Sequence, residues 1–210
     1  MQQGLKRVGI AMAIVLCAAA LARADSVSLV GSMGALGADD SVEWSQLGAD
    51  ATDLPASFGF TSSKGLSGTV SLMGPHSLVS VVCPAGPACS WNPGAGGTGF
   101  GADDSVVWTA DAGNGGNGPL TLKFTSGSVS GVGVMIQADG PSKFTVMIQP
   151  FAGSTSLGGP FSATSDAGGD ASFVGVLDSS GANISSVVLS ISSCEGNCGD
   201  FAIDSLLLRR

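Results

Sequence analysis

Five aspartates have the chemistry and the placement to hold a calcium ion. Four of them form two pairs inside near-identical octets, Gly-Ala-Asp-Asp-Ser-Val-Glu-Trp at residues 37–44 and Gly-Ala-Asp-Asp-Ser-Val-Val-Trp at residues 101–108. The fifth, Asp204, belongs to an apolar stretch near the end of the chain. Calcium takes about six to eight oxygen ligands from carboxylates and loop carbonyls. The sequence therefore predicts a structural calcium ion held by the following aspartates: Asp39, Asp40, Asp103, Asp104 and Asp204.

Asp204 is the central member of this set because of its position on the predicted closing strand. A regular strand over residues 201–208 places it on the same side as Ala202, Leu206 and Leu208. A carboxylate on an apolar side is costly unless it is paired or bound to a cation. The alternative is that Asp204 lies at the rim of a sheet, in water.

The cysteines predict two local disulfide bonds. Cys83 and Cys89 enclose Pro-Ala-Gly-Pro-Ala, and Cys194 and Cys198 enclose Glu-Gly-Asn. An even number of cysteines in an exported chain is typical of disulfides, and each pair closes a short loop. Four cysteines allow three pairings, and the sequence leaves that choice open. A four-thiolate zinc site is the competing interpretation, but the spacing is irregular and an exported chain meets an oxidising compartment.

An aromatic residue in an irregular stretch is the candidate ligand platform. Trp91 and Asn92 lie in a Gly- and Pro-rich stretch, residues 83–101, where strand alternation does not account for an indole. An exposed aromatic ring can stack on a sugar ring while its neighbours donate and accept hydrogen bonds. We therefore expect Trp91 and Asn92 to contact a ligand.

Catalytic signatures are weak, and we predict that the protein is not an enzyme. His76 is the single histidine and lies in a Gly-Pro-His-Ser turn. No nucleophile elbow of the Gly-x-Ser-x-Gly type precedes a helix. Hydrolysis of a glycoside needs two facing carboxylates, and Glu43 and Glu195 are the only glutamates. A polysaccharide-active hydrolase is therefore the less favoured alternative.

The first 24 residues have the form of a secretory signal peptide. Lys6 and Arg7 precede an apolar run at residues 8–21, which ends in Ala22-Arg23-Ala24. The run is short for a bilayer span, which disfavours an uncleaved anchor. We therefore expect a signal peptide at residues 1–24, one domain at residues 25–210, and no membrane span after cleavage.

The charge balance excludes one class of partner. The whole chain carries a formal charge of −8, and removal of residues 1–24 leaves five basic residues against sixteen acidic ones, a charge of −11. A nucleic-acid-binding domain needs a basic face that releases counterions, so nucleic acid is not an expected partner. With 33 glycines, nine prolines and no tyrosine, the composition is typical of an exported bacterial β-protein.

Alternating apolar residues predict an all-β fold. Within residues 118–151, three stretches alternate at a period of two and predict three consecutive strands in a meander, covered by a second sheet. Counting the remaining stretches gives about eleven to twelve strands in a two-sheet, antiparallel, jelly-roll-like β-sandwich. The octet tryptophans, Trp44 and Trp108, are expected in the core between the sheets. The other predicted strands include residues 57–61, 68–73, 78–82, 161–164, 173–177, 185–191 and 201–208.

Several of these stretches resemble exported bacterial domains found in PEP-CTERM (exosortase-sorted) proteins. The stretches are residues 40–48, 102–108, 118–122, 129–138, 144–148, 173–177 and 200–204. The resemblance implies a β-sandwich at the cell surface or in the extracellular matrix of a Gram-negative bacterium, with no established activity. Such proteins commonly continue into a Pro-Glu-Pro motif, an apolar helix and a basic end, whereas this sequence ends at Leu208-Arg209-Arg210. Free secretion, or a periplasmic location, is therefore also expected.

The closing stretch is also similar to the last strand of jelly-roll carbohydrate-binding modules. In those modules an aspartate at this point ligates a structural calcium, which implies that role for Asp204. The leading hypothesis is a secreted module that binds a glycan or a matrix polysaccharide. A purely structural or adhesive surface protein without a small ligand is the alternative.

Overall fold

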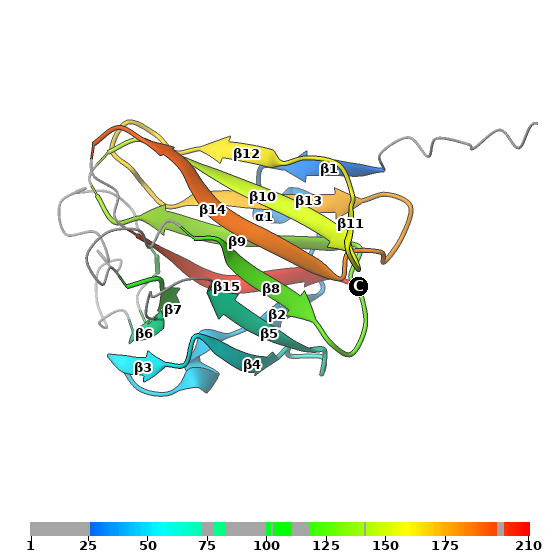
Figure 1. The fold of residues 1–210 in the computed structure, drawn as a ribbon, viewed down its shortest axis with the longest axis horizontal. Coiled ribbons are helices and arrows are strands. Elements are labelled where there is room, and N and C mark those ends of the chain that lie inside the picture. The colour runs from blue at the N-terminus through cyan, green and yellow to red at the C-terminus, as the bar shows by residue number, and fades with distance from the viewer. Residues whose placement is uncertain are drawn as a thin grey trace, which may run out of the picture.

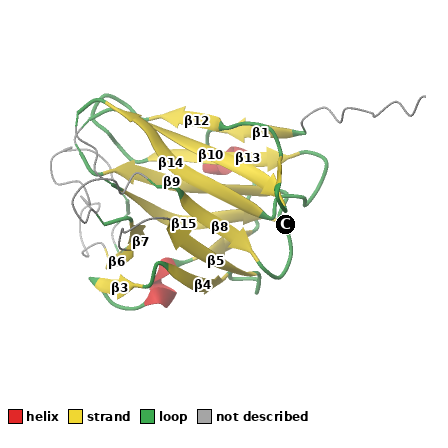
Figure 2. Cartoon of the chain, viewed as in Figure 1, coloured by secondary structure: helices red, strands yellow, loops and turns green. Residues whose placement is uncertain are grey.

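A computed structural model describes residues 26–72, 78–82, 100–101, 103–110, 118–140, 142–196 and 200–210, with only the backbone of residues 81 and 82. Within these ranges the chain forms fifteen strands and two one-turn helices (Figure 1). The strands assemble into two antiparallel sheets packed face to face as a sandwich, and strands dominate the whole view (Figure 2). The predicted all-β sandwich is confirmed.

The first sheet has eight strands, hydrogen-bonded in the order β1-β13-β9-β15-β7-β6-β3, with β2 pairing to β15. Each pairing in it is antiparallel. Its strands are β1 (Val27–Val30), β2 (Asp40–Val42), β3 (Thr52–Leu54), β6 (Leu78–Val82), β7 (Ser105–Trp108), β9 (Gly131–Ala138), β13 (Ser172–Asp178) and β15 (Phe201–Arg209).

The second sheet has seven strands in the order β11-β10-β14-β8-β5-β4, with β12 pairing to β10. These pairings are antiparallel as well. Its strands are β4 (Ser57–Thr61), β5 (Ser67–Leu72), β8 (Leu120–Phe124), β10 (Phe144–Ala152), β11 (Thr155–Ser156), β12 (Phe161–Thr164) and β14 (Ser186–Cys194).

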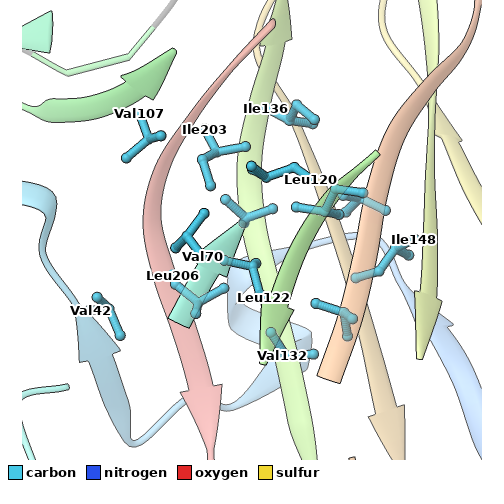
Figure 3. Close-up of a cluster of buried hydrophobic side chains, with 14 of the residues drawn as sticks. Val42, Val70, Val107, Leu120, Leu122, Val132, Ile136, Ile148, Ile203 and Leu206 are labelled. Atoms are coloured by element: carbon cyan, nitrogen blue, oxygen red, sulfur yellow. The ribbon is translucent and has the colours of Figure 1, made fainter. Parts of the chain in front are cut away.

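The core fills the space between the two sheets. Side chains from the eight-stranded sheet, such as Val132 and Leu206, meet side chains from the seven-stranded sheet, such as Leu120 and Leu122 (Figure 3). All four of these side chains are at most 1% exposed. Each inward position belongs to an alternating stretch, because successive residues of a strand point to opposite faces.

The three strands predicted within residues 118–151 exist as β8, β9 and β10, but they are not neighbours. β8 and β10 lie in the seven-stranded sheet with β14 between them, and β9 lies in the eight-stranded sheet. The predicted meander is therefore wrong. Alternation specifies which side of a strand is buried, and it does not specify which strand lies beside it.

Two short helices were not predicted, because one turn is too short to show a helical period. α1 (Met33–Leu36) begins at Ser32, whose Oγ accepts a 3.2 Å hydrogen bond from the amide of Ala35, and ends at Gly37, whose φ is 61°. Its buried Leu36 packs against Gly131 on the outer face of the eight-stranded sheet. The second, η1 (Trp44–Leu47), is a 3₁₀ turn that follows β2.

The two octet tryptophans have different surroundings. Trp44 is fully buried between the sheets and contacts Phe58 and Phe60 edge-on, with ring centroids 6.5 Å and 6.0 Å apart, so its predicted core position is confirmed. Trp108 packs instead with a small cluster that contains Val106. The expectation that Trp108 faces the inter-sheet space is wrong, because in β7 it is the neighbouring residue, Val107, that belongs to the main core.

Candidate functional site

Asp204 lies in a β-bulge of the closing strand. The register between β15 and β9 shifts between Ile203 and Leu206, and both of these residues belong to the core between the sheets. The two residues between them, Asp204 and Ser205, occupy the bulge. The prediction that Asp204 shares a face with Leu206 and Leu208 is wrong, because an extra residue in the strand reverses the alternation beyond it.

Three carboxyl groups from distant parts of the chain come together around this bulge. The Asp204 carboxylate accepts a 2.5 Å hydrogen bond from the amide of Ser205, whose hydroxyl donates a 2.6 Å bond to Glu43. Burial, together with the negative charges of Asp104 and Glu43, raises the pKa of Asp204 to about 6, although the hydrogen bonds from Ser205 lower it. We call Glu43, Asp104 and Asp204 the bulge carboxyls.

The bulge carboxyls have the chemistry to bind a proton or a hard cation. A carboxyl whose pKa lies near 6 is protonated by a mild acid, and neighbouring carboxylates are the ligands that calcium prefers. Within the described ranges, no group of three or more Asp, Glu, His or Cys side chains is arranged so that it could hold a metal ion. The bulge carboxyls are therefore not a preformed metal site, and a calcium ion here would have to draw them closer together and take carbonyl or water oxygens as well.

Glu43 was missed as a member of this group. The two octets differ at one position, where Glu43 in the first corresponds to Val107 in the second. This difference between the octets could have indicated that Glu43 has a role that Val107 does not share. Val107 is fully buried in the core, whereas Glu43 is exposed and lies beside the bulge.

The acidic pair of the first octet lies elsewhere. Asp40 pairs with Leu208 across the β2–β15 ladder, four residues beyond Asp204, which is about 13 Å along a strand. Its carboxylate accepts hydrogen bonds from the Ser62 and Ser63 hydroxyls at 2.7 Å and 2.8 Å and from the Lys64 amide at 2.9 Å. Burial alone would raise the pKa of Asp40, but these bonds outweigh it and lower the pKa.

Asp39 is held at the same end of the sandwich. It accepts a 2.9 Å bond from the amide of Arg210 and forms a 3.1 Å ion pair with Lys64. The Arg210 amide, followed by Lys64, lowers the pKa of Asp39. The structure therefore assigns Asp39 and Asp40 to a hydrogen-bonded corner with residues 62–64, and it does not bring them to Asp204.

The acidic pair of the second octet forms a tight turn before β7. Asp103 has a positive φ of 65°, and the Asp104 carboxylate accepts a 2.5 Å hydrogen bond from the amide of Gly101. Of the four octet aspartates, Asp104 is the one whose charge acts on Asp204.

Other predicted site residues lie outside the described residues. They are Trp91, Asn92, Cys83, Cys89 and Cys198, and the single histidine, His76, lies outside the described residues too. Cys194, at the end of β14, is disulfide-bonded. The predicted local pairing stays a prediction, as do the ligand contacts of Trp91 and Asn92.

The outer face of the seven-stranded sheet is a second feature that sequence reasoning did not single out. Cross-strand pairing aligns outward residues in rows. One row runs through Ser57, Ser71, Thr121, Val188 and Gln149. The next row contains Thr69, Lys123, Ser186 and Phe151. We call these two rows, together with Met147, Ser190 and Ser162 beyond them, the hydroxyl face.

No protein-family model, curated protein or solved structure matches this chain. In the part of the chain that the structure describes, no helix combines the length and the hydropathy needed to cross a bilayer.

Proposed function

We propose that the protein is a secreted, non-catalytic module of the cell surface or extracellular matrix that binds a glycan or matrix polysaccharide. The observation that carries this proposal is the hydroxyl face. Its outward side chains are mostly serine and threonine, in register across neighbouring strands about 4.8 Å apart. Hydroxyl groups both donate and accept hydrogen bonds, as sugar hydroxyls do.

Apolar side chains interrupt these hydroxyls where a sugar ring could pack. Met147, Phe151 and Val188 are half-buried and lie outside the main core cluster. Met147 and Phe151 alternate with the core residues Val146 and Ile148 and the buried Pro150 along β10. An aromatic ring beside hydroxyls suits a sugar, which has an apolar ring face and a polar edge.

Calcium is proposed as a structural ion at the bulge carboxyls. The supporting observations are the raised pKa of Asp204 and the convergence of Glu43 and Asp104 on it. A bound cation would favour the ionised form of Asp204 and remove the repulsion among the three carboxyls. It would also tie the second octet to the closing strand.

Retention on a panel of soluble and insoluble polysaccharides, in calcium and in a chelator, tests the proposed function. We expect retention on at least one polymer. Ser190→Glu places bulk and charge on β14, an inner strand of the hydroxyl face, and should abolish retention. Ser28→Glu, at an exposed position of edge strand β1 in the other sheet, changes the net charge equally and should leave retention intact.

The same assay separates the hydroxyl face from the sequence-predicted ligand residue. Loss of retention in Trp91→Ala, with Ser190→Glu unaffected, would move the binding surface to the stretch that contains Trp91. Absence of retention of the unmodified chain on every polymer, in both buffers, would contradict glycan binding.

A further inference from the structure

Charge is distributed unevenly between the two sheets. Strands of the eight-stranded sheet carry Asp40, Asp53, Asp178 and Asp204. The seven strands of the other sheet contain neither aspartate nor glutamate. In a chain of formal charge −8, the hydroxyl face is therefore a surface without a carboxylate of its own strands.

Two lysines project on the side of this acid-free sheet. Lys123 lies on β8, opposite Thr69 on one side and Ser186 on the other, and its side chain is exposed. Lys143 precedes β10 and lines an open hollow of about 300 Å³ with Thr145 and Thr164, whose hydroxyls lie 3.1 Å apart. Both lysines thus border the outward side of one sheet.

These lysines differ from two other cations of the chain. Lys64 is paired with Asp39 at 3.1 Å, and an Arg210 guanidinium nitrogen lies 3.9 Å from an Asp40 carboxylate oxygen. Within the described ranges, no ion pair joins Lys123 or Lys143 to an acid. Glu195 lines the same hollow as Lys143 but is not paired with it.

We infer that the polymer bound by the hydroxyl face is an extended polysaccharide whose sugars carry carboxylates, with Lys123 and Lys143 as its charge contacts. This inference rests on the proposed function and names the ligand class of the same surface. Lys123 lies opposite Ser186 of β14, and Phe144, the neighbour of Lys143, lies opposite Cys194 of the same strand. Measured along β14, the two lysines are therefore eight residues apart, about 27 Å. That separation needs a chain of several sugars rather than a small ligand.

The protein's overall negative charge does not prevent such binding. At physiological ionic strength the screening length is about 8 Å, so charges on the far sheet act weakly across the sandwich. A polymer on the hydroxyl face therefore responds mainly to the charges it touches. Among the described residues, the hydroxyl face and the hollow beside it carry Lys123, Lys143 and Glu195. Hydroxyls and the half-buried Met147, in the rows between those of the two lysines, would contact the uncharged parts of each sugar.

The test compares polymers that differ only in their carboxylates. Polygalacturonate and hyaluronate are each assayed beside their carboxyl-reduced forms, at fixed ionic strength and calcium concentration, by affinity electrophoresis of the full chain. We expect stronger binding to a carboxylated polymer than to its reduced form. Lys123→Gln and Lys143→Gln should each weaken that binding about two- to fivefold, because exposed ion pairs are individually weak.

Lys64→Gln is the matched control, because it removes the same charge from a lysine that already has a partner. It should leave binding to the carboxylated polymer within about 1.5-fold of the unmodified chain. Equal binding to both forms of each polymer, or an equal loss in all three lysine variants, would overturn the inference while glycan binding stands. Failure of the unmodified chain to bind any polysaccharide would overturn both.

Discussion

The indole Nε1 of Trp44 donates a 2.8 Å hydrogen bond to the backbone carbonyl oxygen of Asp204, 160 residues further along the chain. The same indole packs edge-on against Phe58 and Phe60 of the seven-stranded sheet. One side chain therefore joins the bulge of the closing strand to the opposite sheet. The bond fixes the backbone from which the Asp204 carboxyl extends.

Trp44→Phe should reduce the free energy of unfolding by about 1–3 kcal/mol, because the Asp204 carbonyl would lose its buried donor. Urea denaturation followed by circular dichroism measures the change. Ser57→Ala, at an exposed position of β4, is the control and should change stability by less than about 0.5 kcal/mol. An unchanged midpoint in Trp44→Phe would show that the bond contributes nothing.

Asp204→Asn should stabilise the protein above about pH 6. The folded-state pKa of Asp204, about 6, lies above the ordinary value of 3.8, so the folded state binds the proton more tightly than the unfolded chain. The stability that Asp204 contributes is present in acid and is lost as pH rises from about 4 to 6. Each pH unit in that window is worth about 1.4 kcal/mol, so we expect a gain of about 1–3 kcal/mol at pH 7.5.

Denaturation midpoints measured from pH 4 to pH 8 check this expectation. The unmodified chain should lose stability through that window, and Asp204→Asn should show a flatter profile. Parallel profiles for the two proteins would mean that another group carries the pH dependence.

Calcium should raise the melting temperature of the unmodified chain at pH 7.5, because a ligand that binds only the folded state stabilises it. The increase should disappear in Asp204→Asn and persist in Asp53→Asn, where the carboxylate is exposed on edge strand β3. Differential scanning fluorimetry in calcium and in chelator gives both values. An equal response of the two variants would place the ion elsewhere or make the effect nonspecific.

Asp178→Asn should destabilise the fold by about 2–3 kcal/mol at pH 7. The carboxylate is 3% exposed and accepts bonds from Ser26, Ser180 and Asn183. Burial alone would raise its pKa, but these donors lower it to about 2. In Asp178→Asn, the side-chain NH₂ group would replace the oxygen that accepts the bond from the Asn183 NH₂ group, and two donors cannot bond each other.

The pH dependence of that substitution has a definite sign. Because the pKa of Asp178 is lowered, its contribution is present above about pH 4 and is lost as pH falls to about 2. The difference between Asp178→Asn and the unmodified chain should therefore shrink in acid. A difference that stays constant from pH 7 to pH 2 would contradict a role for the ionised carboxylate.

Gly68→Ala should destabilise the protein by about 1–3 kcal/mol, since the site is already filled. A methyl group there would overlap the Phe60 ring and lie 2.6 Å from the backbone oxygen of Lys123. Gly59→Ala is the control in the adjacent strand, because its nearest neighbour would lie 3.8 Å away. Urea midpoints of the two variants should differ, and equal midpoints would mean that Phe60 moves aside freely.

Local sequence patterns predicted the fold class and most strand positions. Residues 57–61, 78–82 and 161–164 form strands with the predicted bounds, and Trp44 is buried as expected. Alternation of apolar and polar residues is a local property, so it can be recognised from neighbouring residues alone. The unusual position of Asp204 on an apolar stretch was visible for the same reason.

The pairing of strands and the grouping of acidic residues could not be predicted from local patterns, because both depend on tertiary packing. β9 lies in the eight-stranded sheet, whereas β8 and β10, which precede and follow it along the chain, lie in the seven-stranded sheet. Asp40 accepts hydrogen bonds from residues 62–64 and does not lie at the bulge. The choice of strand partner depends on contacts between residues that are far apart in the sequence, and a local pattern contains no information about those contacts. The extra residue in β15 reverses the alternation beyond Asp204, so Asp204 does not share the core face of Leu206 and Leu208. Burial, with the charges of Asp104 and Glu43, raises its pKa.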